Sequence, residues 1–176
     1  MDGPQSEHVA RLNRLRDAFA EANGRLVARL RRATDDAAMV EVEGGWSAAQ
    51  IGWHVATVTT RFAGLISGEI SGAQPLAADF RERPWGEIAS GIPERASAPS
   101  AVKPPARVRR ADAIDALEAS AAKMALAFDV LTLERGRGEG ITNPMVGTIN
   151  VYQIAEWATA HVKRHNRQAK RTLGEV

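Results

Sequence analysis

The chain contains no cysteine among its 176 residues. A protein without cysteine has no disulfide, no thiolate metal ligand and no cysteine nucleophile, so any metal site must use nitrogen and oxygen donors. No hydrophobic run approaches the roughly 18 residues of a membrane span, and the first residues already mix acidic and basic side chains. We therefore expect a cytoplasmic protein without a membrane partner.

The chain also lacks a strong excess of charge and the common motifs of phosphate and acyl chemistry. Its formal net charge is only +2, although the sequence pI is about 9.4. Its basic stretches have no interleaved aromatic residues on which bases could stack. No serine lies in a G-x-S-x-G motif, and the glycine-rich residues 136–140 lack the Lys-Ser/Thr of a phosphate loop. These absences count against a nucleic-acid partner and against an α/β-hydrolase.

Apolar residues recur at helical spacing in four segments, and the alternation typical of strands is absent at useful length. The helices are expected to start near Ser6, after Ser47, at Asp112 and behind a cap at Thr148 or Asn150. The second start has the clearest signal because Gln50 completes a capping box, and this helix should end near Ser67. The glycine-rich residues 136–140 should form a flexible turn before the last helix. A chain of this length should form one domain, residues 1–176.

Residues 68–110 separate the second and third helices and hold six of the eight prolines. Connections this long are uncommon inside a compact domain. A helical bundle whose second and third helices run parallel needs such a crossover, because the chain must return along a helix before it starts the next. The sequence therefore predicts an all-α fold, a four-helix bundle with residues 68–110 as a long crossover that contains short helical turns.

The chain has four histidines, His8, His54, His161 and His165. His161 and His165 project from one face of the last helix, one turn apart. If the second and fourth helices are antiparallel, His54 lies at a similar depth, and three neutral imidazoles could hold a divalent ion with a position left open. The alternative is a core histidine at 54 and two surface histidines on a basic helix end. His8, near an expected frayed start, should have no partner.

Two segments resemble a known family. The stretch "WSAAQIGWHVATV", residues 46–58, is similar to a helix of the DinB-like (DinB/YfiT) superfamily that begins with a tryptophan-serine cap and carries one histidine. The last helix of that superfamily is matched at Thr148, Glu156, Trp157, His161, His165 and Gln168. One departure is Asn143 before Pro144, where many relatives have His-Pro. The two motifs cover about a quarter of the chain.

The resemblance implies a bacterial four-helix bundle with a zinc, nickel, iron or manganese ion on His54, His161 and His165. Some relatives transfer low-molecular-weight thiols or use them as cofactors, others are described as metal-dependent hydrolases, and many pair as homodimers. The predicted function is a metal-dependent enzyme of the thiol S-transferase or hydrolase type. The alternative is a non-catalytic metal- or small-ligand-binding module that acts through protein partners.

Four further residues are candidates around this site. Gln168, three residues after His165, is placed to hydrogen-bond a ligand histidine. Arg61 and Trp85 could line a pocket for a small-molecule substrate or thiol, although solvation and loop packing explain them equally well. Glu156 lies off the ligand face and is expected to pair elsewhere.

Overall fold

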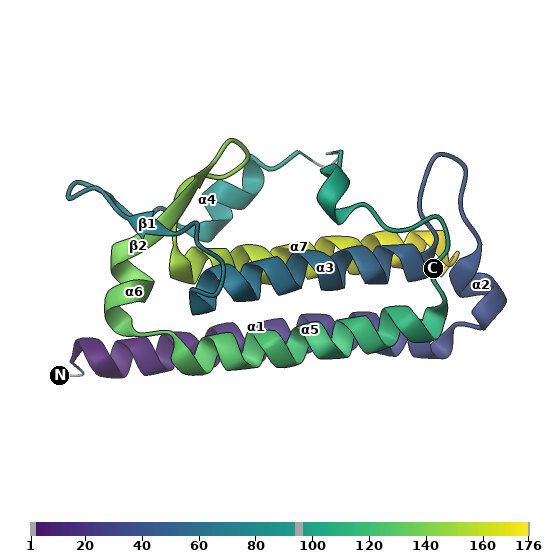
Figure 1. Ribbon diagram of the computed structural model, residues 1–176, viewed down its shortest axis with the longest axis horizontal. Helices are drawn as coiled ribbons and strands as arrows, with labels where there is room; N and C mark the ends of the chain where they lie inside the picture. Colours follow the sequence, from purple (N-terminus) through teal and green to yellow (C-terminus); the bar gives the residue numbers. More distant parts are fainter. Residues whose placement is uncertain (1–2, 94–96, 176) are drawn as a thin grey trace.

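The computed structural model describes residues 3–93 and 97–175, and 66% of the chain is helical. Four long helices lie side by side along the long axis of the molecule (Figure 1). They are α1 (Pro4–Arg32), α3 (Ala48–Ser67), α5 (Arg110–Val130) and α7 (Val151–Thr172). The shorter helices are α2 (Asp35–Met39), α4 (Trp85–Ser90), α6 (Leu133–Gly138) and the 3-10 helix η1 (Ser100–Val102). The expectation of a mainly helical chain is confirmed.

A small antiparallel sheet packs beside the start of α7, although the sequence shows no strand-like alternation at useful length. Its order is β1-β2-β3, formed by β1 (Gln74–Pro75), β2 (Glu139–Asn143) and β3 (Gly147–Asn150). Ile141 pairs with Ile149 across β2 and β3, and Gln74 pairs with Gly140. Strands of two to five residues are too short for an alternating pattern to reveal them.

The direction of the long helices follows from their connections (Figure 1). Helices α3 and α5 run parallel, and residues 68–109 cross from the end of one to the start of the other. This connection contains β1, α4 and η1, so the expected short helical turns are present. Helix α7 runs antiparallel to α3 and packs against it. The N-terminal half of α3 therefore lies beside the C-terminal half of α7.

Capping boxes fix the starts of both helices that carry the histidine motifs. The Ser47 side chain accepts a hydrogen bond from the Gln50 backbone, and the Gln50 side chain accepts one from the Ser47 backbone. Asn150 and Gln153 make the same reciprocal pair at the start of α7. Each box satisfies backbone N–H groups that have no partner inside the helix. The expected start after Ser47 and the alternative of Asn150 as the last cap are confirmed.

Two other expected starts are wrong by a few residues. Helix α1 begins at Pro4 and not at Ser6, because proline suits the first helical position, where no backbone N–H is needed. Helix α5 begins at Arg110 and not at Asp112, whose carboxylate accepts two hydrogen bonds from the Arg109 guanidinium. A polar side chain close to a helix start does not by itself identify the cap.

Residues 136–140 form the end of α6 and the start of β2, so the expectation of a flexible turn there is wrong. Gly140 pairs with Asn150, and a Cβ at Gly140 would lie 2.1 Å from the Ile149 backbone oxygen. Glycine is therefore needed for the close approach of β2 to β3. This reason depends on a tertiary contact and cannot be read from the local sequence.

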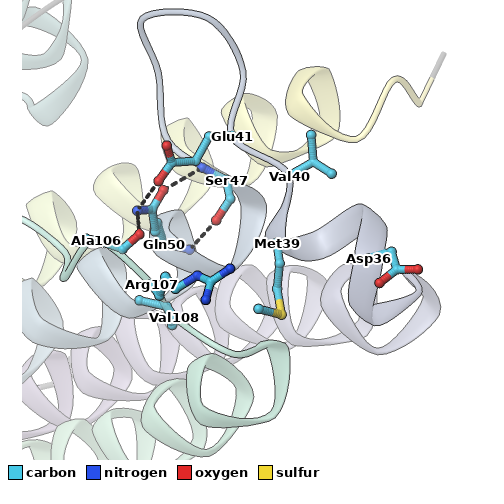
Figure 2. A pocket seen from close by; sticks show the side chains of 9 residues that line it. All are labelled: Asp36, Met39, Val40, Glu41, Ser47, Gln50, Ala106, Arg107 and Val108. Carbon is cyan, nitrogen blue, oxygen red and sulfur yellow. Dashed lines mark hydrogen bonds between the residues drawn. The ribbon is translucent and has the colours of Figure 1, made fainter.

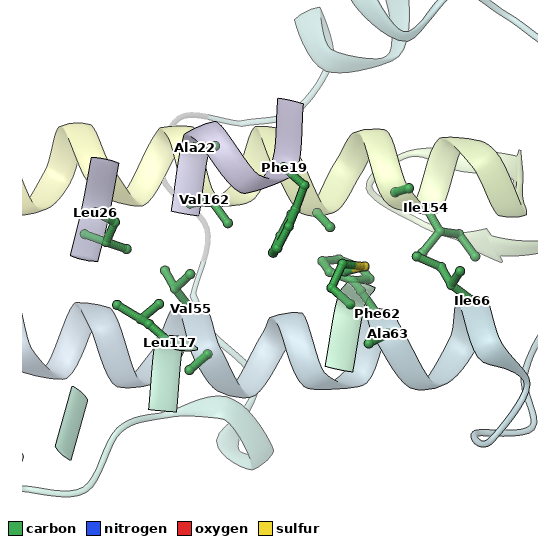
Figure 3. Packing of buried hydrophobic residues seen from close by; sticks show 14 of the residues in the cluster. Phe19, Ala22, Leu26, Val55, Phe62, Ala63, Ile66, Leu117, Ile154 and Val162 are labelled. Atoms are coloured by element: carbon green, nitrogen blue, oxygen red, sulfur yellow. The ribbon is translucent and has the colours of Figure 1, made fainter. Parts of the chain in front are cut away.

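The hydrophobic core lies between the four long helices (Figure 3). Fully buried side chains from each helix meet there, among them Leu26, Val55, Leu117, Ile154 and Val162. Their burial removes apolar surface from water and holds α3 against α7. The core is thus what places residues of α3 beside residues of α7.

His8 is buried, which corrects the expectation that it lies at a frayed start without a partner. Its exposed fraction is 6%, and its Nδ1 lies 2.5 Å from the Tyr152 hydroxyl oxygen. Tyr152 is itself buried, and the Arg11 guanidinium carbon lies 4.3 Å from the centre of its ring. This contact joins the start of α1 to the start of α7.

We predict that His8→Ala lowers the free energy of unfolding by about 1–3 kcal/mol, because it leaves the buried Tyr152 hydroxyl unpaired. Urea denaturation of the variant measures this loss. Asn13→Ala, at an exposed position of the same helix, is the control and should change stability by less than about 0.5 kcal/mol. Equal stability of His8→Ala and the wild type would show that the contact contributes nothing.

Candidate metal centre

Three histidines from two helices converge between α3 and α7. One nitrogen each from His54, His161 and His165 lies within 4.8 Å of the other two. The ring centres are 5.1 Å apart for His54 and His161, 4.8 Å for His54 and His165, and 4.4 Å for His161 and His165. His54 is buried and the other two are half-buried. The antiparallel packing of α3 and α7 creates this cluster.

The spacing of two of these nitrogens fits a shared ion. His54 Nε2 and His161 Nε2 are 3.2 Å apart. Two nitrogens bound to one tetrahedral zinc at 2.0–2.1 Å are separated by about 3.3 Å. The pair therefore already has nearly the separation that a tetrahedral ion requires.

Hydrogen bonds orient two of the three rings. The Nδ1–H of His54 donates to the Val102 carbonyl oxygen at 2.8 Å. The Nδ1–H of His165 donates to Gln168 Oε1, also at 2.8 Å. In a neutral imidazole one nitrogen carries the proton and the other keeps a lone pair, so both rings present Nε2 as the coordinating atom. Ligand histidines in metalloproteins are commonly held in this way.

His161 has a buried nitrogen without a partner among the described residues. Its Nδ1 is inaccessible to solvent and makes no hydrogen bond there. In one tautomer of His161, Nε2–H donates to His54 Nε2 and the buried Nδ1 is an acceptor without a donor. In the other tautomer, Nδ1 carries the proton and the Nε2 lone pairs of the three rings face one another. Both arrangements cost free energy, and a cation between the three rings relieves the repulsion of the lone pairs. The donor set therefore fits a divalent metal ion.

The surroundings keep all three imidazoles neutral. Burial lowers the pKa of His54 below its ordinary value and outweighs the opposing effect of the Val102 carbonyl. Burial also lowers the pKa of His161 well below 6.5, aided by the charges of His165, His54 and Arg164. Burial and the proximity of His54 lower the pKa of His165 to about 4. Neutral imidazole is the form that binds metal, so the cluster is ready to coordinate near neutral pH.

The crossover supports this site through backbone atoms that the sequence did not identify. Gln50 lies one turn before His54, and its Nε2 donates to the carbonyl oxygens of Pro105 and Ala106 at 3.1 Å. Gln50 also donates to Glu41, and a pocket of about 630 Å³ lies beside this network (Figure 2). Together with the bond from His54 to Val102, these contacts attach the crossover to α3. Carbonyl oxygens of this kind have no sequence signature.

The remaining candidates lie at different places. Gln168 contacts His165 as stated above. Trp85 lines a pocket of about 220 Å³ whose lining includes none of the three histidines. Arg61 is exposed on α3. Glu156 lies 3.6 Å from Arg11, on another face of α7 than the histidines. Of these four candidates, Gln168 is the one that hydrogen-bonds a histidine of the cluster within the part of the chain that the structure describes.

Comparison with known proteins places the chain in a family. A family model described as the DinB superfamily matches residues 10–169, nearly the whole chain. A search of curated proteins returned no match. No helix in residues 3–93 and 97–175 is long and apolar enough to cross a membrane.

We predict that Gln168→Ala weakens zinc binding by about 10- to 100-fold, because the His165 ring loses the acceptor that fixes its tautomer and orientation. A competition titration with a zinc-binding dye measures the affinity. Asn13→Ala, which removes an amide side chain at an exposed position away from the cluster, should bind zinc like the wild type. An unchanged affinity of Gln168→Ala would mean that this hydrogen bond does not position the ligand.

We predict that the metal-free protein loses stability as the pH falls from about 6.5 towards about 4. In this window the histidines of the unfolded chain bind protons, whereas the folded pKa of each cluster histidine is lowered, so the unfolded state binds more protons. Urea denaturation in the presence of a chelator at about pH 7 and about pH 5 checks this sign. His161→Asn should show a smaller loss, and a stability that rises on acidification would contradict the lowered values.

Proposed function

The chain belongs to the DinB superfamily, and from this premise we propose that it binds one divalent metal ion through His54, His161 and His165. The observation that carries this proposal is the convergence of three imidazole nitrogens within 4.8 Å. Two of these rings have Nδ1 hydrogen bonds that direct Nε2 towards the cluster. We also propose that the four long helices form a single four-helix bundle domain with residues 68–110 as its crossover.

The proposed role is that of a metal-dependent enzyme of the thiol S-transferase or hydrolase type. A divalent ion held by three neutral imidazoles supplies Lewis-acid activation of a water or a low-molecular-weight thiol. The protein contributes the ligand side chains and the hydrogen bonds that orient them. His54, His161 and His165 would hold the ion, and the Val102 carbonyl and Gln168 fix the tautomers of His54 and His165.

The half-buried state of His161 and His165 supports a catalytic site over a closed structural one. A structural zinc site is usually filled by four protein ligands, whereas catalytic sites use three and keep one position for solvent or substrate. The cluster among the described residues has three potential ligands. The alternative function, a non-catalytic metal- or small-ligand-binding module that acts through protein partners, uses the same ligands without turnover. Pairing of the chain as a homodimer is a separate proposal and fits either function.

We predict that the purified protein binds one zinc, nickel, iron(II) or manganese ion per chain and that His54→Ala, His161→Ala and His165→Ala each remove most of the affinity. Loss of one of three ligands removes a metal–nitrogen bond that no other described side chain is placed to replace. Isothermal titration calorimetry measures the stoichiometry and affinity, and circular dichroism verifies that each variant is folded. Wild-type binding by two or more of the variants would disprove the ligand assignment.

Activity distinguishes the two functions. The metal-loaded protein is incubated with low-molecular-weight thiols plus an electrophile, and separately with activated esters. Turnover that stops with a chelator, returns with metal and is lost in His161→Ala supports the enzyme. Metal binding without turnover in either assay supports the binding module.

A further inference from the structure

A second pocket lies on the other side of α7 from the three histidines. Its volume is about 220 Å³, roughly seven times the volume that a water molecule occupies in the liquid. It is bounded by Leu15 and Ala18 of α1, Trp85 of α4, and Glu156, Ala160 and Lys163 of α7. On a helix with about 100° between residues, His161 and His165 point roughly 140° and 180° away from Glu156. The pocket is therefore separate from the metal centre.

Glu156 is the acidic residue of the pocket lining, and its carboxylate is incompletely paired. The nearby Arg11 donates two hydrogen bonds to Glu82, at 2.5 and 3.1 Å. Arg11 and Glu156 form a looser ion pair at 3.6 Å, which is longer than a hydrogen bond. Glu82 also accepts from Asn150, so Glu82 is the better satisfied carboxylate. Burial raises the pKa of Glu156, and the neighbouring Arg11 opposes this rise only in part.

The remaining walls are suited to an apolar group. Leu15 is buried, and Ala18, Ala160 and the half-buried Trp85 present hydrocarbon and aromatic surface. The face of an indole attracts an organic cation, and a carboxylate in a partly desolvated pocket forms its strongest hydrogen bonds with a charged donor. Lys163 opposes a cation, but it is exposed and lies two helical turns from Glu156, where water and salt weaken its field.

We propose that this pocket binds a small organic amine as its ammonium, with the N–H groups donating to Glu156 and a short apolar or aromatic body against Leu15, Ala160 and Trp85. This site goes beyond the proposed metal chemistry and does not depend on it. Charge complementarity favours this occupant, because Glu156 lines the pocket as a half-buried acid, whereas Lys163 is exposed. The pocket volume limits the ligand to roughly the size of benzylamine.

The test is a titration of the zinc-loaded protein with benzylamine, followed by the backbone amide signals of the pocket residues and the Trp85 indole signal in NMR. Binding with a millimolar dissociation constant is expected, and Glu156→Gln should weaken it by about tenfold because a charge-assisted hydrogen bond is lost. Lys163→Gln is the matched control, since it removes the other charge of the lining. This variant should bind benzylamine at least as well as the wild type.

Trp85→Leu gives a second measure and should weaken binding while Glu156 is retained. The neutral benzyl alcohol and the anionic benzoate should bind more weakly than benzylamine. Equal binding by the wild type and Glu156→Gln, stronger binding of benzoate, or no shift of the pocket signals would each overturn the proposal. Zinc titration of the same variants separates the two sites, because Glu156→Gln should leave the metal affinity unchanged.

Discussion

Three imidazole rings within contact distance of one another must remain uncharged, and this constraint governs the region between α3 and α7. Two protonated rings 4.4 to 5.1 Å apart would repel each other in surroundings that already disfavour charge. Burial resolves the conflict by lowering the pKa of each ring. The consequence is a set of neutral nitrogen donors within 4.8 Å of one another, which is a donor set that suits a divalent ion.

The core, the two capping boxes and the connection between α3 and α5 hold the three histidines in place. The core places α3 beside α7, and the two capping boxes fix where each helix starts and hence which residues face each other. The connection between α3 and α5 contributes through its backbone, since the Val102 carbonyl accepts a hydrogen bond from His54 and the carbonyls of Pro105 and Ala106 accept from Gln50. A long proline-rich connection thus orients a residue of the histidine cluster in addition to joining two parallel helices.

The cap signals and apolar spacing were enough to predict α3 and α7. Those features repeat locally along a helix, so the sequence displays them. The nearness of His54, His161 and His165 followed only if these helices are antiparallel, which is the topology that the family resemblance implies. The β-sheet was missed because its strands are too short to show an alternating pattern. Glycine is needed at position 140 because the Ile149 backbone oxygen lies close to it, a contact that the local sequence does not display. The burial of His8 was missed because Tyr152, its partner, is 144 residues away in the chain. The ligand roles themselves stay predictions.

The central claim is that one ion is bound by three histidine nitrogens, and zinc X-ray absorption spectroscopy of the loaded protein tests it most directly. The account predicts three imidazole nitrogens at about 2.0–2.1 Å and one or two further light atoms from solvent. The spectrum of His165→Ala should lose one imidazole. A first shell of oxygen atoms without imidazole scattering, or a spectrum unchanged in His165→Ala, would contradict the assignment of the metal centre.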